Sequence, residues 1–253
     1  MIALIDGDVL LYRFGFRGQT EFDWGNGLTS VAVNADETKE ELDKFIKELI
    51  KKASCNQLLV CLSGPKETMF RYSLLPSYKH NRKDAKKPIL FQELKDYLKQ
   101  KYRIVTRPNL EADDCMGILA TKRPGKYVIC TIDKDLQQIP GRFFNWDKME
   151  EPKNISQKQA NKWFYLQILS GDPVDGFSGV PGVGKKRAKA FIDALYESGT
   201  PSEGEIWKQI VDVYAKKGLD ERYALTQARM ARILRVEDWD EKAQKPILWT
   251  PTK

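Results

Sequence analysis

Short apolar runs alternate with amphipathic segments in the N-terminal half of the chain, and this alternation limits the folds that are possible. The runs are IALI, QLLVCL, RIVT and YVICTI, at residues 2–5, 57–62, 103–106 and 127–132. Their length and apolar character are typical of buried parallel strands. Helical periodicity occupies residues 36–53, 91–101 and 111–121. The pattern therefore predicts an α/β fold with a mostly parallel central sheet flanked by helices.

The character of the chain changes after about residue 155. Helical patterns cover residues 158–170, 185–197, 203–216 and 220–235, and an extended tail, PILWTPTK, closes the sequence. We therefore expect an α/β core at residues 1–155 and a mostly helical part at residues 156–253. One stretch, FDWGNGLTSVAV at residues 22–33, is compatible with either a hairpin or a loop, because Gly25-Asn26-Gly27 favours a turn in both.

Cysteine usage and hydropathy indicate a cytoplasmic protein. The four cysteines, Cys55, Cys61, Cys115 and Cys130, form no CxxC pair, and the single histidine, His80, argues against a zinc site. We expect the thiols to be reduced and mostly buried. No apolar run approaches the roughly 18 residues of a membrane span, and the N-terminus has no signal-peptide pattern.

Positive charge is concentrated in one segment. The chain carries a formal net charge of +7, whereas the twelve Lys and Arg between Lys66 and Arg107, set against four acids, give that segment +8. The rest of the chain is left at −1. A basic segment on a nearly neutral body indicates a polyanion site, although a solvated charged face is the simpler alternative.

Acidic residues gather where the predicted strands end. In an open parallel sheet, ligands bind outside the carboxyl ends of the strands. Four segments bring acids toward that edge: IALIDGD, LEADD, TIDKD and GDPVDG. The acids are Asp6, Glu111, Asp113, Asp114, Asp133, Asp135, Asp172 and Asp175.

Each acidic segment has a structural explanation when taken alone, as a helix cap, a first-turn acid or a turn residue. Taken together, carboxylates within reach of one another repel unless a cation lies between them. Within these motifs only Lys134 interrupts the acids. Hard divalent cations prefer oxygen ligands, so the set favours Mg²⁺ or Mn²⁺.

A glycine-rich segment provides a second candidate site. GVPGVGKKRAKAF, residues 179–191, combines Gly179, Gly182 and Gly184 with a predicted helix start and four basic residues. Backbone N–H groups at a helix N-terminus favour an anion, and glycine permits close approach. The spacing fits neither a Walker A loop nor GxGxxG. It is typical of a helix–hairpin–helix loop that contacts a nucleic-acid backbone, and a turn between packed helices is the alternative.

In their order and approximate spacing, these motifs resemble the 5′-nuclease (flap endonuclease) superfamily, and most closely the small 5′→3′ exonucleases of bacteriophages. The segment FRYSLLPSYKHNRK, residues 70–83, and the later QARMARILRVEDW belong to the resemblance. It implies a PIN-like core, a helical arch or clamp at about residues 66–90, and a C-terminal helix–hairpin–helix subdomain with its loop at residues 179–184.

The resemblance also implies roles for individual residues. Asp6, Glu111 and Asp113 would bind a first metal ion, and Asp133, Asp135 and Asp172 a second, with Asp114 and Asp175 supporting them. Arg71, Lys79 and Arg82 would act on the scissile phosphate. Tyr78 would stack on a base. The expected DNA contacts are completed by Lys83, Gly179, Val180, Gly182, Gly184, Lys185 and Lys186, with a K⁺ ion at the loop.

The implied activity is divalent-metal-dependent hydrolysis at 5′ ends, nicks or flaps of DNA by a monomer, in phage replication or recombination, with RNA–DNA hybrids as a further substrate. The chain departs from the family at Gly64, which occupies the position of an aspartate, and Asp8 is expected to be a turn residue. Two alternatives remain: a structure-specific DNA-binding protein with weak or no catalysis, and a metal-dependent ribonuclease of the PIN type.

Overall fold

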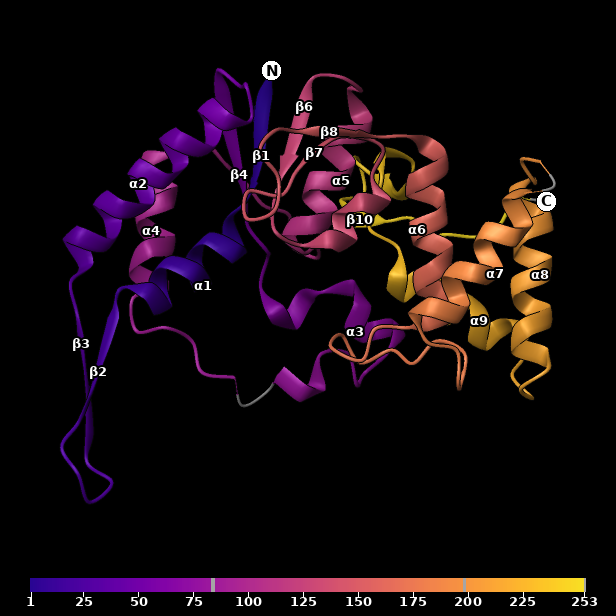
Figure 1. The fold of residues 1–253 in the computed structure, drawn as a ribbon, viewed down its shortest axis with the longest axis horizontal. Coiled ribbons are helices and arrows are strands. Elements are labelled where there is room, and N and C mark those ends of the chain that lie inside the picture. Colours follow the sequence, from indigo (N-terminus) through magenta and orange to yellow (C-terminus); the bar gives the residue numbers. More distant parts are fainter. Residues whose placement is uncertain (83–84, 198, 253) are drawn as a thin grey trace.

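A six-stranded sheet forms the centre of the N-terminal part. The structure is a computed structural model that describes residues 1–82, 85–197 and 199–252 (Figure 1). The strand order is β5-β4-β1-β6-β7-β8, and only β8 runs antiparallel to its neighbour. The strands are β1 (Ile2–Asp6), β4 (Gln57–Cys61), β5 (Ile104–Val105), β6 (Tyr127–Cys130), β7 (Gly141–Phe144) and β8 (Lys153–Ile155). The predicted mostly parallel sheet is confirmed.

Helices cover both faces of this sheet, because alternate strand residues point to opposite sides. Ala3 and Ile5 face a core formed with α1 (Gly7–Arg17), α2 (Ala35–Lys52) and α4 (Phe91–Lys101). Leu4 faces the opposite core, which includes residues of α5 (Ala112–Lys122) and the C-terminal segment around Trp239. Helix α1 was not predicted from the sequence; its buried face consists of Leu10, Leu11 and Phe14 beside two glycines.

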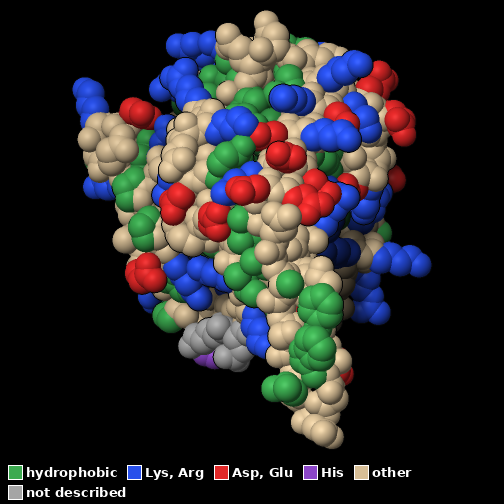
Figure 2. All heavy atoms as spheres, turned by 90° about the vertical axis from the view of Figure 1, so that its left-hand side faces the viewer, with side chains coloured by type: hydrophobic (Ala, Val, Ile, Leu, Met, Phe, Trp, Pro, Cys, Tyr) green, Lys and Arg blue, Asp and Glu red, His purple; other side chains and the backbone are tan. Residues whose placement is uncertain are grey.

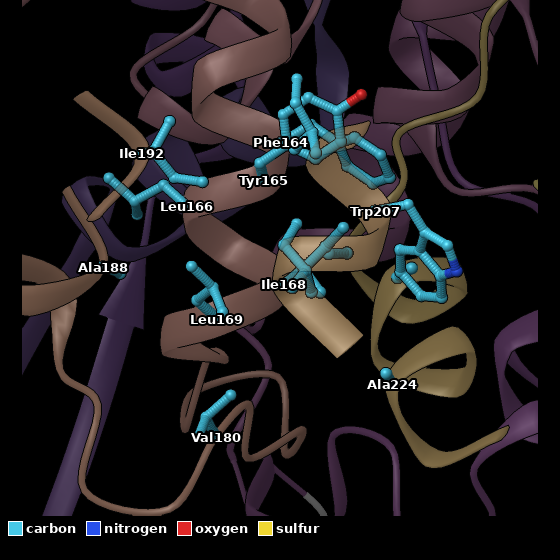
Figure 3. Packing of buried hydrophobic residues seen from close by; sticks show 14 of the residues in the cluster. Phe164, Tyr165, Leu166, Ile168, Leu169, Val180, Ala188, Ile192, Trp207 and Ala224 are labelled. Atoms are coloured by element: carbon cyan, nitrogen blue, oxygen red, sulfur yellow. The ribbon is translucent and has the colours of Figure 1, made fainter. Parts of the chain in front are cut away.

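The helical part has a core of its own. It contains α6 (Gln157–Ser170), α7 (Lys185–Glu197), α8 (Glu203–Ala215) and α9 (Glu221–Ala231). Figure 3 shows Phe164, Ile168 and Leu169 of α6 in this cluster with Trp207 of α8. Tyr78 belongs to the same cluster, so the segment after α3 (Phe70–Leu74) is anchored on the helical part. Ser156 and Ser202 cap α6 and α8 with reciprocal hydrogen bonds, as a capping box does.

Short elements complete the described chain. The 3₁₀ helices are η1 (Lys66–Thr68), η2 (His80–Arg82), η3 (Lys134–Gln138) and η4 (Val236–Asp238), and β9 (Trp239–Asp240) pairs with β10 (Lys245–Pro246). Among the described residues, no helix is long and apolar enough to cross a membrane. All four cysteines are free and three of them are buried, as expected.

The ambiguous segment forms a hairpin that projects from the body. Strand β2 (Gln19–Asp23) pairs with β3 (Thr29–Val33), and Gly25, Asn26 and Gly27 all have positive φ in the turn. Because only glycine and asparagine adopt such angles readily, these residues favour the turn. Figure 2 shows hydrophobic side chains gathered on this projection. The rings of Phe22 and Trp24 stack with their centroids 6.0 Å apart.

Candidate metal and nucleic-acid site

The site lies at the carboxyl ends of the parallel strands, where the topology predicts it. Asp6 ends β1 and caps α1, accepting hydrogen bonds from the Val9 amide at 3.1 Å and the Thr131 hydroxyl at 2.8 Å. Asp133 follows β6 and caps η3 by accepting from the Asp135 amide at 2.8 Å. The cap positions explain why these acids are tolerated locally, and both acids line the same cavity.

The LEADD segment brings acids to this edge from α5. Glu111 is the N-cap of α5, and Asp113 lies in its first turn. The GDPVDG segment arrives from the end of α6, where Gly171 lies so close to Gly179 that a side chain on either glycine would collide with the other's backbone. Asp172 then pairs with Phe177 in an isolated β-bridge, which holds the turn containing Asp175.

Seven of the eight predicted acids line two adjoining cavities. The larger, of about 540 Å³, is lined by five of them: Asp6, Glu111, Asp113, Asp133 and Asp175. A smaller one, of about 40 Å³, shares all of these except Asp6 and adds Asp135 and Asp172. We refer to the two together as the acidic cleft. Residues far apart along the chain therefore converge on one site.

Asp114 has a different place from the predicted one. It is fully buried and lines neither cavity; it accepts two hydrogen bonds from the Arg71 guanidinium, at 2.6 and 2.8 Å. Arg71 is itself only 4% exposed and also contacts Glu111 at 2.9 Å. A buried bidentate pair of this kind holds its members and their neighbours in fixed positions. Arg71 still lines the smaller cavity, but its guanidinium, predicted to contact the scissile phosphate, is engaged by Asp114 and Glu111.

Lys79 and Arg82 reach the cleft from the segment between α3 and α4, which we call the arch segment after the arch predicted at about residues 66–90. Lys79 pairs with Glu111 and lies 3.8 Å from Asp175, while Arg82 pairs with Asp175 at 2.6 Å. The side chain of Arg82 is 44% exposed, so it is available to a ligand. A cavity of about 750 Å³ beneath the arch contains both cations. Lys83 lies outside the described residues.

Tyr78 differs from its expected role as a base-stacking residue. Its side chain is 3% exposed, and its hydroxyl donates to Glu111 at 2.8 Å. The ring packs edge-on against Tyr72. A ring enclosed in this way cannot stack on a base without leaving the core, so Tyr78 positions Glu111.

The pKa values of the carboxylates differ strongly across the cleft. Burial, together with the neighbouring charge of Asp8, raises the pKa of Asp6 to about 7. Burial and the charges of Asp6 and Asp133 raise the pKa of Asp113 well above its usual range. Burial would also raise the pKa of Glu111, but Lys79 and Arg71 outweigh it and hold that pKa at about 2. The cleft thus has one neutralised side and one side with uncompensated negative charge.

The donor chemistry of the uncompensated side fits a hard divalent cation. All the groups are carboxylates, and one buried oxygen, Oδ1 of Asp135, accepts no hydrogen bond among the described residues and has only the Lys134 ammonium, at 3.3 Å, as a partner. Within the same part of the chain, no three His, Cys, Asp or Glu side chains are already gathered closely enough to hold a metal ion. The residues therefore fit the ions by chemistry, and binding would draw the carboxylates closer together.

Asp8 was missed as a site residue. It lies in the first turn of α1, lines the larger cavity and accepts from the Ser63 amide with both carboxylate oxygens at 3.3 Å, so it is not a turn residue. The signal in the sequence was the second acid of DGD, which a helix beginning at Gly7 directs to the strand end. Gly64 contributes no acid, and a Cβ there would lie 2.5 Å from the Arg107 carbonyl oxygen.

The glycine-rich loop presents only part of its predicted contact set. Gly179 donates its amide to Gln227 at 2.9 Å and Val180 is buried, so both hold the loop in place. Gly182 and Gly184 are exposed, as are Lys185 and Lys186 at the start of α7. The exposed half forms a basic helix N-terminus, an arrangement that favours phosphate.

Comparison with known proteins identifies relatives across nearly the whole chain. A family model described as the N-terminal resolvase-like domain of 5′-3′ exonuclease matches residues 1–164. The exodeoxyribonuclease of Enterobacteria phage T3 is 29% identical over 282 residues, which cover 99% of this chain and 93% of the relative. The exonuclease of Escherichia phage T7 is 28% identical with the same coverage.

Solved structures share the fold. The T5 D15 protein co-crystallised with metal ions has a TM-score of 0.60 and 18% identity, covering 91% of this chain and 88% of its own. A second structure, of the D15 flap endonuclease of bacteriophage T5 in a pseudo-enzyme-product complex with DNA and metal ions, also has a TM-score of 0.60. At this level of identity the likeness establishes the PIN-like arrangement of sheet and helices.

Proposed function

We propose that the chain, which belongs to the 5′-3′ exonuclease family and is a hydrolase acting as a 5′-3′ nuclease, cleaves DNA. It would hydrolyse phosphodiesters at 5′ ends of duplex or branched DNA, with divalent cations as cofactors. The observation that carries the proposal is the acidic cleft beside the arch cations Lys79 and Arg82. A polyanion would not enter such a cleft unless cations compensated its carboxylates.

Two groups of carboxylates would hold the ions. Asp6, Glu111 and Asp113 form the first group and Asp133, Asp135 and Asp172 the second, with Asp175 beside both. Bound Mg²⁺ or Mn²⁺ supplies a nucleophilic water at neutral pH and stabilises the leaving oxygen. The structures of the T5 relative with metal ions, one of them also with DNA, support a requirement for divalent cations.

The remaining roles follow from side-chain environment. Lys79 and Arg82 are paired with carboxylates of the cleft, and a DNA phosphate that enters would compete for both cations. Arg71 and Tyr78 hold Glu111 in place from behind. No Ser, Cys or His is needed as a protein nucleophile, because water is the attacking group.

The duplex would lie along the helical part. The exposed loop residues Gly182 and Gly184, with Lys185 and Lys186, form a basic helix N-terminus that can contact phosphates without reading sequence. A K⁺ ion at this loop is part of the proposal. We further propose that the protein acts in phage DNA replication or recombination in the host cytoplasm, because phage T3 and T7 enzymes match nearly its whole length. That it acts as a monomer is also part of the proposal.

One assay separates the candidate activities. The substrates are a duplex, a flap and an RNA–DNA hybrid, each labelled at the 5′ end, with Mg²⁺ or EDTA. We expect short labelled products from the DNA substrates only with Mg²⁺, and Asp133→Asn should abolish them while binding in Ca²⁺ persists. Asp36→Asn, on α2 away from the cleft, is the control.

The outcomes distinguish the hypotheses. Cleavage that is confined to RNA would support the ribonuclease, and DNA binding without cleavage by the unaltered chain would support the non-catalytic binder. Normal turnover by Asp133→Asn would refute the metal assignment.

A further inference from the structure

We propose that Asp8 is an additional cation-binding carboxylate of the cleft, on the side facing the arch. The inference rests on the proposed function, since it concerns the same ions. Its basis is the geometry around Ser63. The Ser63 amide donates to both oxygens of Asp8 at 3.3 Å, while the Ser63 hydroxyl accepts from the Ala112 amide at 3.0 Å.

Ser63 therefore joins two acidic segments that are distant in sequence. Ala112 lies between Glu111 and Asp113, so the hydrogen bonds from Asp8 through Ser63 lead directly to the segment that carries these two proposed ligands. Asp8 is also two residues after Asp6. It thus lies between the end of β1 and the start of α5, the two places from which the first group of carboxylates comes.

Asp8 lies at the boundary between two cavities. It lines the cavity of about 540 Å³ together with Asp6 and Asp113, and it lines the cavity of about 750 Å³ beneath the arch together with Lys79 and Arg82. A cation bound here would be positioned between the acidic cleft and the path of an entering strand. Ordinary helix stabilisation does not require such a position.

The two residues that follow β4 beside Asp8 supply no carboxylate. Ser63 and Gly64 follow β4 directly, and an acid at position 64 would collide with the backbone of Arg107 and Pro108. Lys79 and Arg82 pair with Glu111 and Asp175, and among the described residues no ion pair is formed by Asp8. The carboxylate at this strand end is therefore supplied from α1; Lys95 acts on its charge from the same cavity but forms no ion pair with it.

Two structural explanations compete with cation binding. A first-turn acid is stabilised by the helix dipole, and a carboxylate that accepts from an amide holds a turn in place. Asparagine separates these roles. It retains an oxygen that can accept from Ser63, but it removes the charge that attracts a cation. Alanine removes both the acceptor and the charge.

The experiment measures Mn²⁺ binding to the full chain by calorimetry and by electron paramagnetic resonance of free Mn²⁺, without DNA. The variants are Asp8→Asn, Asp8→Ala, the proposed ligand change Asp133→Asn, and Asp36→Asn as a matched first-turn acid outside the cleft. Thermal unfolding in EDTA and in Mn²⁺ gives a second readout and shows that each variant is folded.

We expect Asp8→Asn and Asp8→Ala both to weaken Mn²⁺ binding by about tenfold or more, while Asp36→Asn leaves it unchanged. In EDTA the melting temperature of Asp8→Asn should be at or above that of the unaltered chain, because a repulsive charge has been removed, and its rise with Mn²⁺ should shrink.

Wild-type affinity in Asp8→Asn would overturn the inference, and so would weak binding by Asp8→Ala alone, which would show that Asp8 only positions Ser63. If Asp133→Asn weakens binding and Asp8→Asn does not, the proposed function stands without this ligand. If the unaltered chain binds no Mn²⁺, the proposed function itself fails.

Discussion

The guanidinium of Arg82 lies 2.6 Å from the carboxylate of Asp175, although 93 residues separate them along the chain. Both belong to the proposed site, one on the side of the nucleic acid and the other on the side of the metal ions. Because the two side chains are paired, a DNA phosphate must displace Asp175 to bind Arg82, and a metal ion must displace Arg82 to bind Asp175. Because Arg82 is 44% exposed at its side chain, the pair itself adds little to folding stability.

Arg82→Ala should therefore change the two ligand affinities in opposite directions. DNA binding should weaken, and the slope of log affinity against log salt should fall by about one phosphate contact, roughly 0.9. Mn²⁺ binding should become tighter, because Asp175 loses a competing cation. Lys47→Ala, an exposed cation on α2, is the matched control. An unchanged salt slope together with unchanged Mn²⁺ affinity would show that the pair belongs to neither site.

The exposed basic start of α7 gives a prediction for duplex binding. The double change Lys185→Ala with Lys186→Ala should weaken binding to duplex DNA about uniformly across sequences and reduce the salt slope by up to about two contacts. Lys216→Ala with Lys217→Ala, an exposed pair at the end of α8, is the control. Fluorescence anisotropy with two duplexes of unrelated sequence makes the comparison. Equal losses in the two double variants would indicate only a general charge effect.

The strands and most helices were predictable because burial imposes a simple period on the sequence. The α4 bounds match at both ends, and β1 and β4 differ from prediction by one residue at one end. Strand β5 is shorter than RIVT suggests, because only Val60 and Cys61 pair with it. Helix α1 escaped prediction because it follows β1 without a connecting loop: Asp6 is both the last residue of the strand and the cap of the helix.

The sequence predicted that the acids converge on one site, but not which acid pairs with which cation. Topology alone brings Asp6 and Asp133 to one edge, since both follow parallel strands. Which carboxylates are neutralised depends on where the arch cations dock, and the docking depends on Tyr78 entering the helical core. Packing between distant segments therefore decided the roles of Arg71 and Asp114, and no local pattern encodes it.

The backbone packs so closely around Gly64 that a larger residue there should reduce stability. A Cβ at this position would meet backbone atoms of Arg107 and Pro108 at 2.5–2.6 Å, and backbone cannot turn away as a flexible side chain can. Gly64→Ala should lower the free energy of unfolding by about 1–3 kcal/mol. Gly184→Ala, at a glycine that also lacks positive φ and has open space around it, should change it by less than about 0.5 kcal/mol. Equal urea midpoints for the two variants would contradict the predicted collision.

The metal-free protein should lose stability as pH rises through neutrality. Burial raises the pKa of Asp6 from 3.8 to about 7, so the folded state binds a proton more tightly than the unfolded state. The stability from this proton is complete below about pH 4 and is lost as pH passes 7. A shift of three units corresponds to at most about 4 kcal/mol. Glu111, whose pKa is lowered to about 2, acts in the opposite sense and removes stability only below about pH 4.5.

Asp6→Asn isolates this effect, because asparagine can still cap α1 by accepting from the Val9 amide. In EDTA, its melting temperature should exceed that of the unaltered chain at pH 8, and the two should converge below about pH 4, where Asp6 is protonated in both the folded and the unfolded state. Saturating Mn²⁺ should reverse the order at pH 8, since only the carboxylate gains from the ion. A pH profile in EDTA that is the same for both proteins would show that Asp6 does not carry the proton, and the repulsion attributed to the cleft would then have to lie elsewhere.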